Sequence, residues 1–237
     1  MVTARCGAER GCWHFRFSDG LQNLSPTSIG LFGGSFDPPH NGHVALVQAA
    51  LEFLPEVWVV PAGNPVHRKL SERADAYVRL EWMQRIFASD ARVQVLDWET
   101  DSEKPTPTIE TLHRQRRLHP DLSSVLLMGE DAFAGIATWV DYPEHLGLCD
   151  VAVFSRCAQP RSEPGDWRPA QIDQWQEQAE GSGRMIRVEA QLPDVSATKL
   201  RLMAQQGESL RGLVPEIIRK EIEGAYGKHG AGAGVEI

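Results

Sequence analysis

Short apolar runs alternate with amphipathic helical segments along most of this chain, and this alternation constrains the fold more than any other feature. Six predicted strands cover residues 28–36, 56–62, 92–98, 123–129, 149–155 and 184–190. Helical periodicity lies between or after them, at residues 42–54, 76–89, 108–118, 132–139, 142–147 and from Ser196 onward. Strands that alternate with helices need right-handed crossover connections, which cover both faces of a mostly parallel sheet. The sequence therefore predicts one doubly wound α/β domain.

The ends of the chain set the limits of this domain. Residues 1–27 lack helical or strand periodicity, which predicts a disordered N-terminal extension, and the Gly-rich residues 228–237 predict a flexible tail. Residues 28–227 are left for the folded domain. Within it, the polar section 159–183 surrounds one predicted surface helix at 171–180.

Charge and composition exclude several classes of protein. The net charge of −8 argues against a broad nucleic-acid surface, which needs clustered Lys and Arg. No run approaches the roughly 18 apolar residues of a membrane helix, and the N-terminus lacks the apolar core of a secretory signal. The four cysteines form no C-x-x-C pair, which fits reduced thiols. We expect a cytoplasmic protein without nucleic-acid or membrane partners, and its oligomeric state stays open.

The loop after the first predicted strand is the richest in chemistry, and it reads GGSFDPPHNGH over residues 33–43. Gly33 and Gly34 have no Cβ, so their N–H groups can approach a phosphate closely. His40 and His43 face the same way if both lie in the first helical turn, beside the exposed N–H groups of the helix N-terminus. An anion there would favour the protonated form of each histidine. A structural Gly-Gly turn with surface histidines and a metal site are the alternatives.

A second candidate phosphate site lies near the other end of the chain, at VSATKLR over residues 195–201. Ser or Thr before a helical pattern is an N-cap signal, so Ser196 and Thr198 bring hydroxyls and Arg201 brings a cation to another helix N-terminus. An ordinary capped helix is the alternative.

These two motifs resemble those of the nucleotidyltransferase superfamily that carries an H-x-G-H sequence, here His40-Asn41-Gly42-His43. VSATKLR is similar to the superfamily's I-S-x-T-x-x-R phosphate-binding motif. The resemblance implies a Rossmann-like fold and transfer of a nucleotidyl group to a phosphate, with release of pyrophosphate. It implies catalytic roles for His43, His40 and Arg201. The residues that it implies for ATP binding are Gly33, Gly34, Ser35, Phe36, Gly42, Ser196 and Thr198.

Further segments are similar to nicotinate-mononucleotide adenylyltransferases: MGED at 128–131, TWVDY at 138–142, PTPTIETL at 105–112 and PAGNPVHR at 61–68. The resemblance runs from about residue 29 to 227. It implies that Gly129 and Asp131 lie near the ATP ribose. It also implies that Trp139 stacks on the pyridine ring and that Thr108 and Val140 line the substrate site. Pro107 and Val140 stand where that family often has aromatic residues. His67 and Arg68, in a loop after a strand, are candidates for holding the acceptor phosphate, and a solvated charge run is their alternative.

The expected function is therefore transfer of AMP from ATP to nicotinate mononucleotide in NAD biosynthesis. Mg²⁺ would arrive with ATP, since the sequence shows no dedicated carboxylate cage. Nicotinamide mononucleotide, pantetheine phosphate and a CTP-dependent reaction are alternatives that keep the chemistry. A nucleotide sensor without turnover, and a scaffold that uses the helix at 171–180, are alternatives from other classes.

Overall fold

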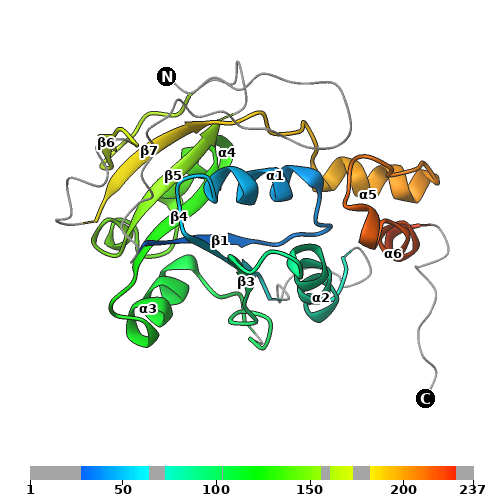
Figure 1. Ribbon diagram of the computed structural model, residues 1–237, viewed down its shortest axis with the longest axis horizontal. Helices are drawn as coiled ribbons and strands as arrows, with labels where there is room; N and C mark the ends of the chain where they lie inside the picture. The colour runs from blue at the N-terminus through cyan, green and yellow to red at the C-terminus, as the bar shows by residue number, and fades with distance from the viewer. Residues whose placement is uncertain (1–27, 64–72, 103, 156–160, 173–181, 228–237) are drawn as a thin grey trace. The chain divides into compact units, whose positions relative to one another are not determined.

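Seven strands of the described residues form one sheet, in the order β3-β2-β1-β4-β5-β7-β6 (Figure 1). Their bounds are β1 Ser28–Gly34, β2 Glu56–Pro61, β3 Val93–Val95, β4 Ser123–Gly129, β5 Cys149–Ser155, β6 Arg168–Ala170 and β7 Arg184–Glu189. The pairs β1–β4, β4–β5, β5–β7 and β6–β7 are parallel. The order reverses between β1 and β4, and such a reversal is where doubly wound sheets bind ligands. The predicted fold class is confirmed.

The computed structural model describes residues 28–63, 73–102, 104–155, 161–172 and 182–227. These residues fall into two units. Unit 1 contains the described residues up to Phe32, together with Ala45–Trp58 and Pro107–Leu192. Unit 2 contains Gly33–Val44, Val59–Thr106 and the described residues from Pro193 onward.

Unit 1 is built on the central strands of the sheet. Strand β5 is buried at every position, and β4 is buried at its five middle ones. Continuous apolar runs of this kind are typical of parallel strands that are covered on both faces. Helix α1 (Asn41–Ala50) lies over one face, and α3 (Thr108–Leu118) lies over the opposite face (Figure 1).

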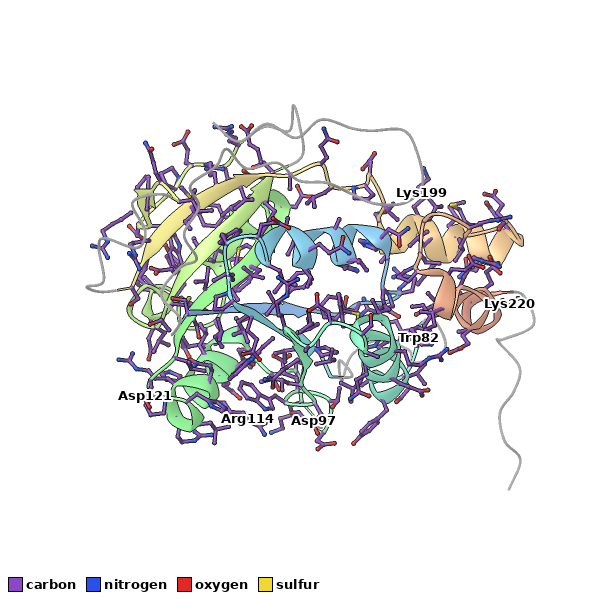
Figure 2. The ribbon with its side chains drawn as sticks, viewed as in Figure 1. Trp82, Asp97, Arg114, Asp121, Lys199 and Lys220 are labelled. Carbon is purple, nitrogen blue, oxygen red and sulfur yellow. The ribbon has the colours of Figure 1, made fainter. Side chains whose placement is uncertain are left out.

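Unit 2 packs three helices around its own apolar cluster. They are α2 (Ala76–Phe87), α5 (Ala197–Gln206) and α6 (Glu216–Tyr226). Trp82 of α2 lies on the side toward α6 (Figure 2), and its Nε1 donates to Glu221 Oε2 at 3.0 Å. The buried members of the cluster are Trp82, Val195, Leu200, Ala204, Leu210, Val214, Ile218, Ile222 and Tyr226.

Several predicted elements differ from the observed ones. The strand predicted at 92–98 is limited to Val93–Val95. The helix predicted at 132–139 begins at Glu130 as α4 (Glu130–Ala134) and continues as the 3₁₀ helix η2 (Ile136–Thr138), because Gly135 interrupts it. The segment at 142–147 contains only the short 3₁₀ helix η3 (Glu144–Gly147). Strand β6 was not predicted.

Helix α6 was also not predicted, although Ile218, Ile222 and Tyr226 recur at the four-residue spacing of a buried helix face. Three predictions lie outside the described residues: the N-terminal extension, the C-terminal tail and most of the helix at 171–180. Across the part of the chain that the structure describes, none of the helices has the length and apolarity needed to cross a membrane.

Gly30 tests how tightly the core of unit 1 is packed. A Cβ at this position would lie 2.9 Å from Leu127 Cδ1 and 2.9 Å from Leu54 Cδ1. We expect Gly30→Ala to lower the free energy of unfolding by about 1 kcal/mol, because overpacking a filled core forces neighbouring side chains to shift. Urea unfolding would measure this change.

Gly224 in α6 offers a matched control, because a Cβ there would meet nothing within 4 Å. Gly224→Ala should leave stability unchanged or raise it by up to about 1 kcal/mol, since alanine is the better helix former. Equal effects of the two substitutions would contradict close packing around Gly30.

Candidate active site

The two histidines of the H-x-G-H motif stack on each other at the start of α1. Their ring centroids lie 3.6 Å apart, and the ring planes are inclined by 17°. His40 is buried and comes directly before Asn41, the first residue of α1. Both imidazoles therefore lie at the N-terminus of α1, as the sequence predicted.

A hydrogen bond fixes how His43 presents its ring. The backbone N–H of His40 donates to His43 Nδ1 at 3.2 Å. His43 is the third residue of α1, so it holds the position that Glu or Gln takes in a capping box. Because Nδ1 accepts, the proton of the neutral ring belongs on Nε2. His43 can thus donate from Nε2 without carrying a positive charge.

Phe36 and Gly42 shape the space around these rings. Phe36 is buried with a left-handed φ of 46°, and its ring meets the His43 ring edge-on at a centroid distance of 5.0 Å. A Cβ on Gly42 would lie 3.0 Å from His40 Nδ1 and 3.5 Å from the Pro193 carbonyl oxygen. Glycine at position 42 therefore allows the loop, the His40 ring and the chain at Pro193 to meet.

Burial lowers the pKa of His43 well below its ordinary value, and the neighbouring His40 lowers it further. The sequence analysis expected an anion to favour protonation of both rings. Burial and the neighbouring His40 instead disfavour the protonated form of the His43 ring. An anion bound beside the two rings would act against this lowering of the pKa.

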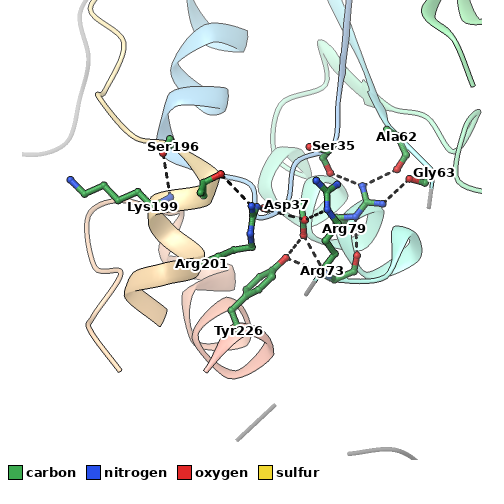
Figure 3. Close-up of polar contacts among 12 residues, drawn as sticks. Ser35, Asp37, Ala62, Gly63, Arg73, Arg79, Ser196, Lys199, Arg201 and Tyr226 are labelled. Atoms are coloured by element: carbon green, nitrogen blue, oxygen red, sulfur yellow. Dashed lines mark hydrogen bonds and ion pairs between the residues drawn. The ribbon is translucent and has the colours of Figure 1, made fainter. Parts of the chain in front are cut away.

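The start of α5 carries the second predicted motif. Ser196 is the N-cap, and its side-chain oxygen accepts a hydrogen bond from the Lys199 backbone N–H at 3.3 Å (Figure 3). Thr198 Oγ1 accepts from Arg201 Nη2 at 3.2 Å. The N-cap prediction for Ser196 is confirmed, and Ser196, Thr198 and Lys199 are exposed.

Arg201 joins the two motifs. Its Nη1 donates to the backbone oxygen of Asp37, which lies in the loop between β1 and α1, and is 3.8 Å from Asp37 Oδ2 (Figure 3). The Asn41 backbone N–H also donates to the Leu213 carbonyl oxygen at 3.0 Å, between α5 and α6. The loop of the first motif and the helix of the second are therefore in contact.

Arg79 of α2 holds the same loop from another side. Its buried guanidinium donates to the backbone oxygens of Ser35, Ala62 at 2.8 Å, Gly63 at 3.2 Å and Ala74 at 3.0 Å (Figure 3). These bonds tie the end of β1 to the end of β2. The sequence analysis assigned no role to Arg79, and its only signal was a charged residue among the buried positions of an amphipathic helix.

The two glycines Gly33 and Gly34 differ in the space around them. Gly33 is exposed, and a Cβ there would meet nothing within 4 Å. A Cβ on Gly34 would lie 3.1 Å from the Phe36 ring, and the Gly34 carbonyl oxygen accepts from Ala62 N at 2.8 Å. Gly33 thus offers an open approach to the backbone, whereas Gly34 serves the packing of Phe36.

Unit 1 holds the residues that the resemblance assigned to the ribose. Gly129 ends β4 and is the N-cap of α4, and Asp131 is exposed in the first turn of that helix. Between them, the buried Glu130 accepts from Ser155 Oγ at 2.5 Å and pairs with Arg187. The Glu130 side chain is therefore held by partners on β5 and β7. The sequence analysis quoted Glu130 within MGED but gave it no role.

Unit 1 also holds the residues that the resemblance assigned to the pyridine ring. Trp139 is half-buried directly after η2, and its ring lies edge-on to the buried His145 ring at 6.0 Å between centroids. Val140 is 56% exposed, so it contributes little to the packing of unit 1. Thr108 is the first residue of α3 and is partly exposed. The candidates His67 and Arg68 lie outside the described residues.

A doubly wound parallel sheet with an H-x-G-H loop after its first strand is the architecture of a nucleotidyltransferase. The model of the family described as Cytidylyltransferase-like matches residues 31–203. The chain of "Plasmodium falciparum nicotinic acid mononucleotide adenylyltransferase complexed with NaAD" has the same fold, with a TM-score of 0.66 at 17% identity. That match covers 84% of this chain and 97% of the other.

Relatives narrow the class further. A protein of Dechloromonas aromatica described as a probable nicotinate-nucleotide adenylyltransferase is 35% identical over 208 residues, with 82% of this chain and 94% of the relative covered. A protein of Pseudomonas aeruginosa with the same description is 35% identical over 202 residues, with the same coverage. The chain therefore belongs to the cytidylyltransferase-like family and, within it, to the nicotinate-nucleotide adenylyltransferases.

The lowered pKa of His43 predicts a pH dependence of stability. As the pH falls through about 6.5, the unfolded chain takes up a proton at this residue before the folded chain does, so folding loses stability below that pH. His43→Gln removes the titrating ring but can still accept the hydrogen bond from the His40 N–H. Urea unfolding at about pH 7.5 and about pH 5.5 should show a smaller loss for this variant than for the wild type.

Burial also lowers the pKa of His145, and this contribution is common to both proteins, so it cancels in the comparison. Equal losses of stability in the two proteins would show that the His43 ring is not kept neutral by its surroundings.

Proposed function

We propose that this protein transfers AMP from ATP to the phosphate of nicotinate mononucleotide, giving nicotinate adenine dinucleotide and pyrophosphate, a step of NAD biosynthesis. The observation that carries the proposal is the contact between the H-x-G-H loop and the start of α5 through Arg201 and Asp37. Two helix N-termini, two imidazoles and one guanidinium are thereby gathered in unit 2. Such a group suits a polyphosphate.

Each group has a distinct part in the proposed binding of ATP. His43 donates from Nε2 to the α-phosphate, and His40 lies beside it on the phosphate chain. Arg201, Ser196 and Thr198 bind the β- and γ-phosphates, with the exposed backbone of Gly33 close by. Mg²⁺ enters as part of the ATP substrate, because magnesium commonly binds substrate phosphates and keeps several waters.

The reaction needs little covalent chemistry from the protein. A phosphate oxygen of the acceptor forms a bond to the α-phosphorus, and the bond from that phosphorus to the bridging oxygen of pyrophosphate breaks. The nucleophile is already ionised, so no general base is required. The protein positions the two reactants and stabilises charge on the transferring group.

The acceptor is assigned from unit 1 and from the family. The half-buried Trp139 offers a flat face to a pyridine ring, and Thr108 at the start of α3 offers a hydroxyl near its carboxylate. Gly129 and Asp131 are proposed for the ribose of ATP. His67 and Arg68 are proposed for the acceptor phosphate.

Pyrophosphate release with ATP and one acceptor at a time tests the proposal. Nicotinate mononucleotide should be the best substrate, ahead of nicotinamide mononucleotide and pantetheine phosphate. Release with CTP in place of ATP should be weak. No release with any pairing would overturn the assignment of an enzyme, and a preference for another acceptor would overturn only the assignment of nicotinate.

His43 should contribute to turnover far more than to ATP affinity, since its contact strengthens as charge moves in the transition state. We expect His43→Ala to lower kcat by about 10²- to 10³-fold, the cost of losing one preorganised donor. The KM for ATP should change little. Near-normal turnover of this variant would remove His43 from the mechanism.

A further inference from the structure

We propose that Tyr226, at the end of α6, is a positioning residue that sets the place of Arg201 through the carboxylate of Asp37. The proposal rests on the proposed role of Arg201 in binding the phosphates of ATP. It adds α6, the last helix of the described residues, to the phosphate site, although no sequence motif of that site reaches this helix.

The Tyr226 hydroxyl donates to Asp37 Oδ1 (Figure 3). The backbone N–H of Ala74 lies 3.2 Å from the same carboxylate oxygen and 3.3 Å from the Tyr226 oxygen. Tyr226 is 6% exposed and Asp37 is 1% exposed, so neither side chain can exchange this hydrogen bond for one to bulk water. Burial first, and the hydrogen bond to Asp37 second, raise the pKa of Tyr226, which keeps the hydroxyl protonated as a donor.

The other carboxylate oxygen of Asp37 faces two cations. Oδ2 lies 3.4 Å from Arg73 Nε and 3.8 Å from Arg201 Nη1. Among the described residues it accepts no hydrogen bond. Arg201 therefore stands just beyond hydrogen-bond distance of a buried negative charge, while its bonds to the Asp37 backbone oxygen and to Thr198 hold it at the start of α5.

The position of Arg201 depends on the two donors to Asp37 Oδ1, which are the Tyr226 hydroxyl and the Ala74 backbone N–H. Without the Tyr226 hydroxyl, the buried carboxylate loses a charge-assisted hydrogen bond and must seek another partner. Two nearby cations can supply it, Arg73 at 3.4 Å and Arg201 at 3.8 Å from Oδ2, and Arg201 would do so by closing onto Asp37. A guanidinium that is closed onto Asp37 has fewer N–H groups to offer a phosphate. Tyr226 thus leaves Arg201 available for the ligand.

The ring of Tyr226 has a separate, structural part. It packs in the cluster of unit 2 beside Trp82, with the ring centroids 6.5 Å apart. Tyr226→Phe keeps this ring and removes only the hydroxyl. The exposed Tyr77 gives a matched control, because its hydroxyl also donates to a carboxylate, that of Asp101, but on the surface of α2.

Calorimetric binding of inorganic tripolyphosphate tests the proposal without acceptor or turnover. We expect Tyr226→Phe to weaken binding by about threefold to tenfold, a part of what a hydrogen bond to a charged group contributes. Tyr77→Phe should bind as the wild type does. In the assay with ATP, the KM for ATP should rise by a similar factor in Tyr226→Phe, whereas the KM for the acceptor should stay the same.

A double-mutant cycle with Asp37→Asn separates positioning from general loss of structure. Once the carboxylate is neutral, Tyr226→Phe should have little further effect on tripolyphosphate binding. Unchanged binding by Tyr226→Phe, or an equal loss in the Asp37→Asn background, would overturn the proposal. If the wild type binds tripolyphosphate but does not use nicotinate mononucleotide, the proposed function fails while the role of Tyr226 stands.

Discussion

The buried carboxylate of Asp37 is the point on which the phosphate site of unit 2 depends. It accepts from Tyr226 of α6, faces Arg73 and Arg201, and lies in the loop that leads to His40. A charge at 1% exposure is tolerated only where it is paired and hydrogen-bonded. Because its partners come from three separate stretches of the chain, satisfying this one carboxylate brings those stretches together.

The same loop is also held by contacts with Arg79 and Phe36. Arg79 donates hydrogen bonds to four backbone oxygens, and Phe36 adopts a left-handed conformation with its ring edge-on to the His43 ring. Strained backbone persists only where the surrounding structure determines it. The cations and N–H groups around the loop are thus fixed before a ligand arrives, which is the condition under which electrostatic stabilisation costs no reorganisation.

The sequence predicted which residues would bind phosphate. It did not predict which distant residues contact one another in the fold. GGSFDPPHNGH and VSATKLR predicted phosphate-binding sites because each places glycines, imidazoles or hydroxyls at a helix start, a local property of a short segment. Their resemblance to a known superfamily implied the class of reaction. The roles of Asp37, Arg79 and Tyr226 could not be read in this way. Apart from the bond from Arg79 to the Ala74 carbonyl oxygen, their partners lie 16 to 189 residues away, and no local spacing encodes such pairs.

By itself, the sequence determined the alternation of strands and helices, the fold class, the N-cap at Ser196 and the position of His40 and His43 at the start of α1. These follow from apolar periodicity and capping, which act over a few residues. Tertiary structure alone decided that α6 joins unit 2 and that Asp37 carries the network around Arg201. Those outcomes depend on which buried groups find partners, and only the packed chain settles that.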